Sequence, residues 1–236
     1  MKRFYKEVSV GADGDGRTIL LDGRPVRSPA RQLLVLPDAA LAQAVADEWR
    51  GQGETIEQAG MALTRLASTA QDRMPALRGA AIDELADYAL TDLLCYRAAQ
   101  PADLAERQQR SWQPWLDWLA RTHGATLVVT TSMLPVTQPE GAVERLRHVI
   151  GQLDDWRLVC LHAATTALGS VVLGLALLDG EIDAEQAFAA SLLDELYEIE
   201  RWGIERDAQR RHEALKRELK AVACFASCLR SAGGRA

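Results

Sequence analysis

The sequence lacks an excess of positive charge. Its 27 Lys and Arg residues are outnumbered by 33 Asp and Glu residues, which leaves a net charge of −6. Proteins that bind nucleic acid carry clustered Lys and Arg, which displace counterions from the phosphate backbone. We therefore expect no nucleic-acid partner, and the acidic balance favours a protein partner with a basic patch.

Cysteine and histidine are also scarce, with four residues of each type. Cys224 and Cys228 share one helix face, but a four-ligand zinc site needs a second pair of ligands. None of the histidines has a Cys or His at ligand spacing on its own segment. Scattered cysteines within apolar helical patterns are typical of a reduced protein core. The sequence therefore predicts no metal site and reduced side chains at Cys95, Cys160, Cys224 and Cys228.

One long run, residues 158–178, carries no formal charge and is long enough to cross a bilayer. The run contains His162 and several Thr, Ser and Gly residues, and acidic residues flank it on both sides. A helix that is apolar on most of its sides is also typical of the centre of a helical domain. We therefore expect a buried helix without membrane insertion, and a membrane-associated factor is the less favoured alternative. Because no secretory leader precedes the first strand, we expect a cytoplasmic location.

Motifs for catalysis and for nucleotide binding are absent. Gly11, Gly14 and Gly16 do not have the spacing of a dinucleotide fingerprint, and no phosphate-binding Gly-Lys-Ser/Thr occurs. A calcium loop that starts at Asp13 would need a carboxylate at the position of Arg24. A Gly-x-Ser-x-Gly nucleophile elbow is also missing. We therefore predict no catalytic residue and no cofactor, and we interpret residues 13–16 as a turn. Asp22-Gly23, which lies between two apolar runs, predicts a second turn of the hairpin type.

The order of the predicted elements indicates the fold class. Strands are expected at residues 4–10, 17–21, 25–28 and 33–36, and the strand-like residues 127–131 are expected to return to this sheet. Strands that precede the helices, without alternating with them, predict an α+β fold. The apolar periodicity predicts helices at residues 39–50, 64–73, after Pro75, and at 103–122, 140–154, 158–178 and 184–229, the last with a break near Gly203. Asp38 and Asp183 are expected to cap the helices that follow them, and Gln186 is at the capping-box position for Asp183.

The chain is long enough for two modest domains. We place a small N-terminal β-containing domain at residues 1–85. A C-terminal helical domain, similar to an orthogonal bundle, is expected at residues 86–236.

A group of charged residues near the C-terminus allows two interpretations. Asp194, Glu195, Glu198, Arg201 and Trp202 lie within nine residues, and their spacing places them on one helix face. The simpler interpretation is a solvated face with a weak ion pair. The alternative is a carboxylate pair for acid–base catalysis, which would need a pocket that separates two pKa values.

The tryptophans also allow two interpretations. Trp112, Trp115 and Trp118 recur at a spacing of three, which is one stripe of a helix and usually lies in the core. Tryptophan is also enriched at the energetic centres of protein interfaces. For Trp112, Trp115 and Trp118 we favour the core, whereas for Trp49 both interpretations stay open.

Several short segments, in their order and spacing, resemble the assembly chaperone family of the α subunit of the F-type ATP synthase, over almost the whole chain. Near the N-terminus they are Arg3 to Lys6, Leu21 to Pro25, Ser28-Pro29, Leu36-Pro37, Glu48-Trp49, Gln52, Met61, Leu63 to Leu66 and Asp72. Further on they are Tyr88, Thr91 to Arg97, Gly169-Ser170, Asp194-Glu195 and Trp202-Gly203. The family tends to carry Gln at the position of Glu198.

The resemblance implies a non-enzymatic chaperone that binds the free α subunit of the F-type ATP synthase and assists assembly of its catalytic head. Asp194, Glu195, Glu198 and Trp202 would bind this partner. The resemblance also implies that Trp49 and Asp72 hold the two parts of the chaperone together. A monomeric, cytoplasmic bacterial relative of mitochondrial matrix proteins is expected. The runner-up is an enzyme that uses the acidic C-terminal helix around a small ligand.

Overall fold

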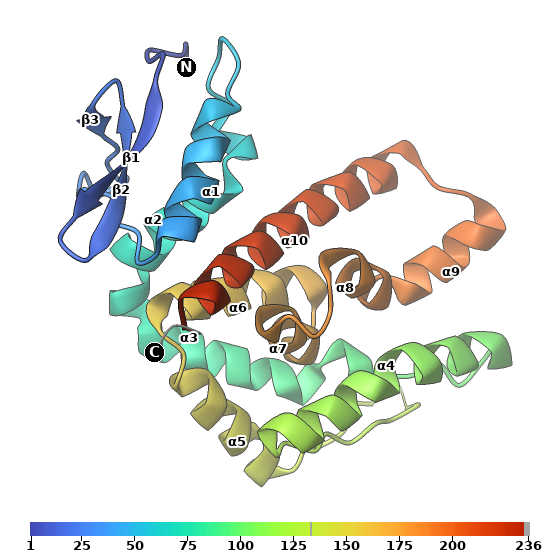
Figure 1. Cartoon of the computed structure of the whole chain (residues 1–236). Coiled ribbons are helices and arrows are strands. Elements are labelled where there is room, and N and C mark those ends of the chain that lie inside the picture. Colours follow the sequence, from blue (N-terminus) through green and yellow to red (C-terminus); the bar gives the residue numbers. More distant parts are fainter. Residues whose placement is uncertain (133, 234–236) are drawn as a thin grey trace.

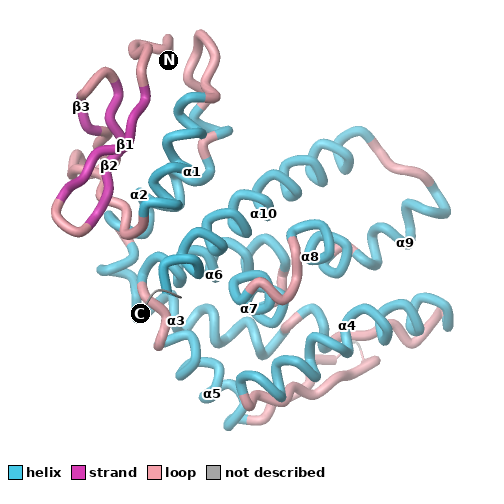
Figure 2. Tube along the Cα trace, in the orientation of Figure 1, coloured by secondary structure: helices cyan, strands magenta, loops and turns pink. Residues whose placement is uncertain are grey.

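The computed structural model describes residues 1–132 and 134–233, and the chain has the expected α+β fold. A small antiparallel sheet contains β1 (Val8–Asp13), β2 (Gly16–Leu21) and β3 (Arg24–Pro25). Figure 1 shows this sheet on one side of the molecule and the bulk of the helices on the other. Figure 2 shows that strands are confined to this N-terminal part.

Two tight turns set the register of the sheet. Asp13 pairs with Gly16 across the first turn, and Leu21 pairs with Arg24 across the second. Gly14 and Gly23 adopt positive φ angles of 55° and 76°, which glycine tolerates without a steric penalty. Both predicted turns are therefore confirmed.

The first strand differs from the prediction. It begins at Val8 instead of residue 4, and Phe4 is 65% exposed whereas Tyr5 is buried. The Tyr5 hydroxyl donates a hydrogen bond of 2.7 Å to the backbone carbonyl of Trp49. Tyr5, not Phe4, therefore attaches the N-terminal segment to the helix that covers the sheet.

That covering helix is α1 (Ala39–Arg50), which packs against β1 and β2. Asp38 caps it, since the carboxylate accepts a hydrogen bond from the backbone N–H of Ala40 at 2.7 Å. Leu41 and Val45 are fully buried on the face toward the sheet. The short helix η1 (Gln58–Gly60) and then α2 (Ala62–Asp72) follow.

The chain then enters its helical part through α3 (Met74–Asp87), η2 (Tyr88–Thr91), η3 (Leu93–Cys95) and α4 (Ala102–His123). In α4, Trp112 and Trp118 are buried and Trp115 is partly buried, so the core interpretation of the tryptophan stripe is confirmed. The helix α3 extends across residue 85 and packs against helices of the C-terminal part. The division of the chain at residue 85 stays a prediction.

Residues 127–131 do not return to the N-terminal sheet. Thr130 instead forms an isolated parallel bridge with Tyr96, next to η3. The Gln138 side chain bonds the backbone N–H and C=O of Val128, at 2.7 and 2.9 Å. β-Branched composition predicted the extended conformation, but nearby polar groups determined its partner.

The prediction of a single helix at residues 158–178 is wrong. The helix α5 (Glu140–Gly151) precedes it, and the run itself divides into α6 (Asp155–Leu168) and α7 (Val171–Asp179). Gly169 ends α6 at a φ of 66°, and the Ser170 side chain caps α7 by accepting from the backbone N–H of Leu173. Among residues 1–132 and 134–233, no helix combines the length and the apolar character that crossing a membrane requires.

Three helices complete the chain: α8 (Ala184–Ser191), α9 (Leu193–Trp202) and α10 (Arg206–Gly233). Asp183 and Gln186 form the predicted capping box at the start of α8. The predicted break near Gly203 is confirmed, with a φ of 81° at this residue, and a second break lies at Leu192. The long helix α10 returns toward the N-terminal part and packs against α1, α2, α6, α7 and α8 (Figure 1).

Candidate functional site

The candidate site lies on α9, which projects with the start of α10 from one end of the helical part (Figure 1). The N-terminal half of α4 supports the inner side of α9. Asp103 on α4 accepts hydrogen bonds from the Tyr197 hydroxyl and from Arg201, each at 2.7 Å. The Arg201 guanidinium also lies 3.4 Å from the centre of the Tyr197 ring. These contacts give α9 a defined orientation on α4.

Asp194 takes part in this support. Its carboxylate accepts a hydrogen bond of 2.7 Å from the side-chain amide of the buried Gln108 on α4. The Gln108 side chain in turn accepts from the backbone N–H of Ala98. Asp194 therefore joins α9 to α4 through this hydrogen bond and supports the position of α9.

Glu195 is paired on the opposite side, with α10. One carboxylate oxygen lies 2.6 Å from Arg211 and 2.9 Å from the ring nitrogen of His212. His212 is 7% exposed and packs edge-on against Phe188, with ring centres 5.4 Å apart. Glu195 therefore holds α9 against α10, and its carboxylate is already paired with Arg211 and His212.

The remaining two predicted residues face solvent. Glu198 is exposed and forms no ion pair with another residue in the described part of the chain. Trp202 is 85% exposed at the end of α9, and Ile204 beyond it is 43% exposed. The four predicted residues thus divide into an anchored pair, Asp194 and Glu195, and a surface pair, Glu198 and Trp202.

Sequence reasoning missed the residues that support α9. Asp103 and Gln108 lie almost a hundred residues earlier, and Arg211 and His212 follow on another helix. Spacing along one helix reports only neighbours three or four positions apart. No sequence signal of that kind connects α9 to α4 or to α10.

Comparisons with known proteins identify the family. A family model for the ATP12 chaperone protein matches residues 2–120. The chain belongs to the ATP12 chaperone family. Protein atp12, mitochondrial, from Schizosaccharomyces pombe is 24% identical over 241 residues, which cover 97% of this chain and 83% of the yeast protein.

Solved structures agree with this ATP12 assignment. Atp12 from Paracoccus denitrificans is 37% identical, with a TM-score of 0.90, over 96% of this chain and 97% of that one. The Atu1473 protein from Agrobacterium tumefaciens is 36% identical, with a TM-score of 0.92, over 97% of this chain and 86% of that one. The resemblance indicated by the sequence is therefore confirmed, and so is the fold.

Several segments that carry the ATP12 resemblance meet in the structure. The Glu48 carboxylate accepts hydrogen bonds from the backbone N–H groups of Leu63 and Thr64, at 2.9 and 2.8 Å. The Ser170 hydroxyl donates to the buried carboxylate of Asp92, at 2.8 Å to the nearer oxygen. Glu48 thus supports the start of α2, and Asp92 joins η3 to the start of α7. These residues stabilise the fold of this ATP12-family chain, and Asp92 and Ser170 are buried.

Trp49 and Asp72 make their contacts inside the N-terminal part. Asp72 accepts hydrogen bonds from the Ser28 hydroxyl at 2.7 Å and from the backbone N–H of Ala30 at 3.0 Å. The Trp49 ring packs edge-on against Tyr5, with ring centres 5.7 Å apart. These contacts join elements of residues 1–72 to each other. They do not join the two expected domains.

Exposed side chains follow one edge of α9, at Glu198 and Trp202. Neither of the two best-defined cavities is lined by a residue of α9. Across residues 1–132 and 134–233, no three His, Cys, Asp or Glu side chains are arranged to hold a metal ion. In this member of the ATP12 chaperone family, α9 is therefore an anchored helix with an exposed acidic and aromatic edge.

Proposed function

We propose that this ATP12-family chain binds the free α subunit of the F-type ATP synthase through the exposed edge of α9. The observation that carries the proposal is Trp202, 85% exposed beside Glu198 on an anchored helix. Tryptophan offers a large apolar surface and is enriched where interfaces concentrate their binding energy. Such an edge suits a folded protein partner better than a small ligand.

A free subunit of an oligomer exposes apolar surface that its neighbours later cover, and this surface favours aggregation. We infer that the chain covers part of this surface until the subunit joins the catalytic head. Trp202 packs into the partner, and Glu198 faces its basic groups. Charge complementarity of this kind contributes mainly to specificity and to the rate of association. No covalent bond is made or broken in this mechanism.

The anchored residues have a different role in this proposal. Asp194 and Glu195 position α9 through their contacts with Gln108, Arg211 and His212. Because α9 is oriented before the partner arrives, less ordering is needed on binding. A substitution of Glu195 would therefore disturb the support of the helix as well as its charge, so Glu198 is the better position for a test.

The rival hypothesis, an enzyme that uses the same acidic helix, requires a pocket around the carboxylates. The two best-defined cavities lie away from α9 and favour no such role. Membership of the ATP12 chaperone family also supports assembly over catalysis. The chaperone function is therefore our conclusion.

The test is co-purification with the α subunit of the ATP synthase from the native lysate. Glu198→Lys reverses the exposed charge without removing a contact of the fold, and we expect it to reduce the recovered α subunit about tenfold. Trp202→Ala is expected to reduce recovery at least as strongly. Isothermal titration with purified α subunit measures the same loss as a change in Kd.

Asp15→Lys is the matched control, since Asp15 is an exposed carboxylate in the turn before β2, far from α9 (Figure 1). This control should bind the α subunit as the wild type does. Equal binding by Glu198→Lys, Trp202→Ala and the wild type would refute the site. If the wild-type chain captures no α subunit, the partner assignment itself is wrong.

A further inference from the structure

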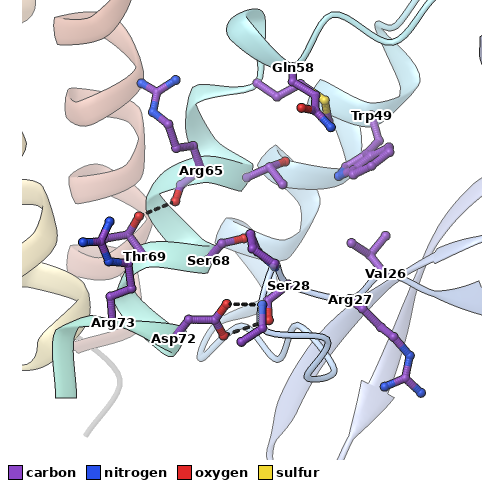
Figure 3. A pocket seen from close by; sticks show the side chains of 14 residues that line it. Val26, Arg27, Ser28, Trp49, Gln58, Arg65, Ser68, Thr69, Asp72 and Arg73 are labelled. Atoms are coloured by element: carbon purple, nitrogen blue, oxygen red, sulfur yellow. Dashed lines mark hydrogen bonds between the residues drawn. The ribbon is translucent and has the colours of Figure 1, made fainter. Parts of the chain in front are cut away.

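A groove of about 830 Å³ lies on the N-terminal part, remote from α9. One wall is a face of α2, and the other is the loop of residues 26–30 that follows β3 (Figure 3). Trp49 and Met61 lie at one end. Two hydrogen bonds from this loop to Asp72 hold the walls together at the other end.

The groove follows the axis of α2. The residues of α2 and its N-cap that line it recur once per turn, from Met61 through Thr64, Ser68 and Asp72. At a rise of about 1.5 Å per residue, this stretch is about 17 Å long. An extended peptide of about five residues has the same length. The groove is therefore elongated like a peptide segment, whereas a compact ligand would fill only part of it.

The end of the groove near Trp49 offers an apolar surface. Val26 and Met61 are buried apolar residues that line the groove. The indole N–H of Trp49 is buried and has no acceptor. Figure 3 shows the nitrogen edge of this indole turned toward the side chains of α2. This N–H is enclosed by the protein, so an occupant of the groove contacts the indole ring and not its nitrogen.

The charges along the groove are mostly positive. Arg27, Arg65 and Arg73 line it together with one carboxylate, Asp72. The Asp72 carboxylate already accepts hydrogen bonds from the Ser28 hydroxyl and from the backbone N–H of Ala30. Arg65 pairs with Glu218 at 2.5 Å, whereas Arg73 forms no ion pair with a residue in the described ranges. The groove therefore offers donors and positive charge to its occupant.

We propose that this groove binds an extended acidic segment of a client protein, with an apolar side chain seated between Val26, Trp49 and Met61. An acidic side chain of the segment pairs with Arg73. The proposal uses a surface separate from α9, so it does not depend on the function proposed above. It adds a second contact through which a chaperone holds an unfolded or flexible part of its client.

The probe is the fluorescein-labelled peptide Gly-Leu-Glu-Asp-Leu-Gly, titrated into the full chain by fluorescence anisotropy. The same peptide with both acidic residues replaced by lysine is the control ligand. We expect the acidic peptide to bind at least about tenfold more tightly than the basic one. Two-dimensional NMR of the six tryptophan indoles should show a shift of one signal, assigned to Trp49 by its loss in Trp49→Phe.

Arg73→Glu is expected to weaken binding of the acidic peptide about tenfold. Arg110→Glu is the matched control, because Arg110 is an exposed arginine on α4, far from the groove, and the change in net charge is the same. This control should bind within about twofold of the wild type.

Three results would overturn the proposal. Equal weakening by Arg73→Glu and Arg110→Glu would mean that the peptide responds only to net charge. Equal binding of the acidic and basic peptides would show that the arginines of the groove do not select an acidic segment. If sodium octanoate shifts the Trp49 signal and the acidic peptide does not, the occupant is a small apolar anion and not a protein segment. None of these results bears on binding of the α subunit by α9.

Discussion

Asp92→Ala is expected to lower the free energy of unfolding by about 3 kcal/mol at pH 7. The carboxylate of Asp92 is fully buried and accepts hydrogen bonds from the Ser170 hydroxyl and from the backbone N–H groups of Leu94 and Val172. Hydrogen bonds to a charged group contribute about 1.5–3 kcal/mol each, and relief of the buried charge offsets part of the loss. For a protein of this size, Tm should fall by roughly 6–12 °C in calorimetry.

The pH dependence separates this role of Asp92 from a simple packing effect. Burial raises the pKa of Asp92 from 3.8 to about 6, and the hydrogen bonds from Leu94, Ser170 and Val172 oppose the shift. As the pH rises from about 4 to 6, the unfolded chain loses this proton before the folded chain does. The proton-linked part of the Asp92 contribution to stability is therefore fully present below pH 4 and is lost as the pH rises through 6, whereas the hydrogen bonds to the carboxylate persist at pH 7.

Asp92→Asn tests the direction in which stability changes with pH. The amide stays neutral, so the variant loses the part of the pH dependence that comes from this carboxyl group. The difference in unfolding free energy between wild type and variant should shrink as the pH rises from 4 to 6. Chemical denaturation at several pH values measures it, with Asp38→Asn, a partly exposed cap of α1, as the control. A difference that is constant between pH 4 and 6 would contradict the raised pKa of Asp92.

Trp112→Ala is expected to cost about 4 kcal/mol of stability, which is typical of a large aromatic side chain removed from a core. Trp112 is fully buried in α4, and its indole N–H donates to the backbone carbonyl of Ala190 at 2.8 Å. The Arg97 guanidinium also lies over its ring, 5.5 Å from the centre. The substitution therefore leaves a cavity and disconnects α4 from the end of α8.

Two further variants make this prediction specific. Trp112→Phe keeps most of the ring but leaves the Ala190 carbonyl without its donor, so we expect an intermediate loss of about 2 kcal/mol. Trp202→Ala removes the same kind of side chain from an exposed position and should leave Tm within about 1 °C of the wild type. Thermal unfolding that ranks the three variants differently would contradict the assignment of Trp112 to the core and Trp202 to the surface.

Trp112 and Trp202 show which features of a helix a residue pattern predicts and which it does not. The stripe of Trp112, Trp115 and Trp118 predicted a core helix, because spacing of three or four positions reports which residues share a face. Trp202 belongs to a similar helical pattern but has no helix packed over it. Periodicity identifies the face of a helix, whereas burial depends on what the rest of the chain places opposite that face.

The run at residues 158–178 shows a second limit of the same kind. Its composition correctly indicated buried helices, but Gly169 and Ser170 end one helix and start the next. The carboxylate of Asp92 reinforces this break, because it accepts from Ser170 at the start of α7. The local turn signals were present in the sequence. Their effect depended on a partner almost eighty residues away.

The sequence by itself determined the α+β class, the two turns of the sheet, the caps at Asp38 and Asp183 and the family resemblance, because these depend on short segments and their order. Only the tertiary structure decided which acidic residues of α9 are free. Asp194 and Glu195 are anchored to α4 and α10, and Glu198 and Trp202 remain exposed. The physical reason is that hydrogen bonds and ion pairs between distant helices depend on how the helices pack, and spacing along one helix carries no record of that packing.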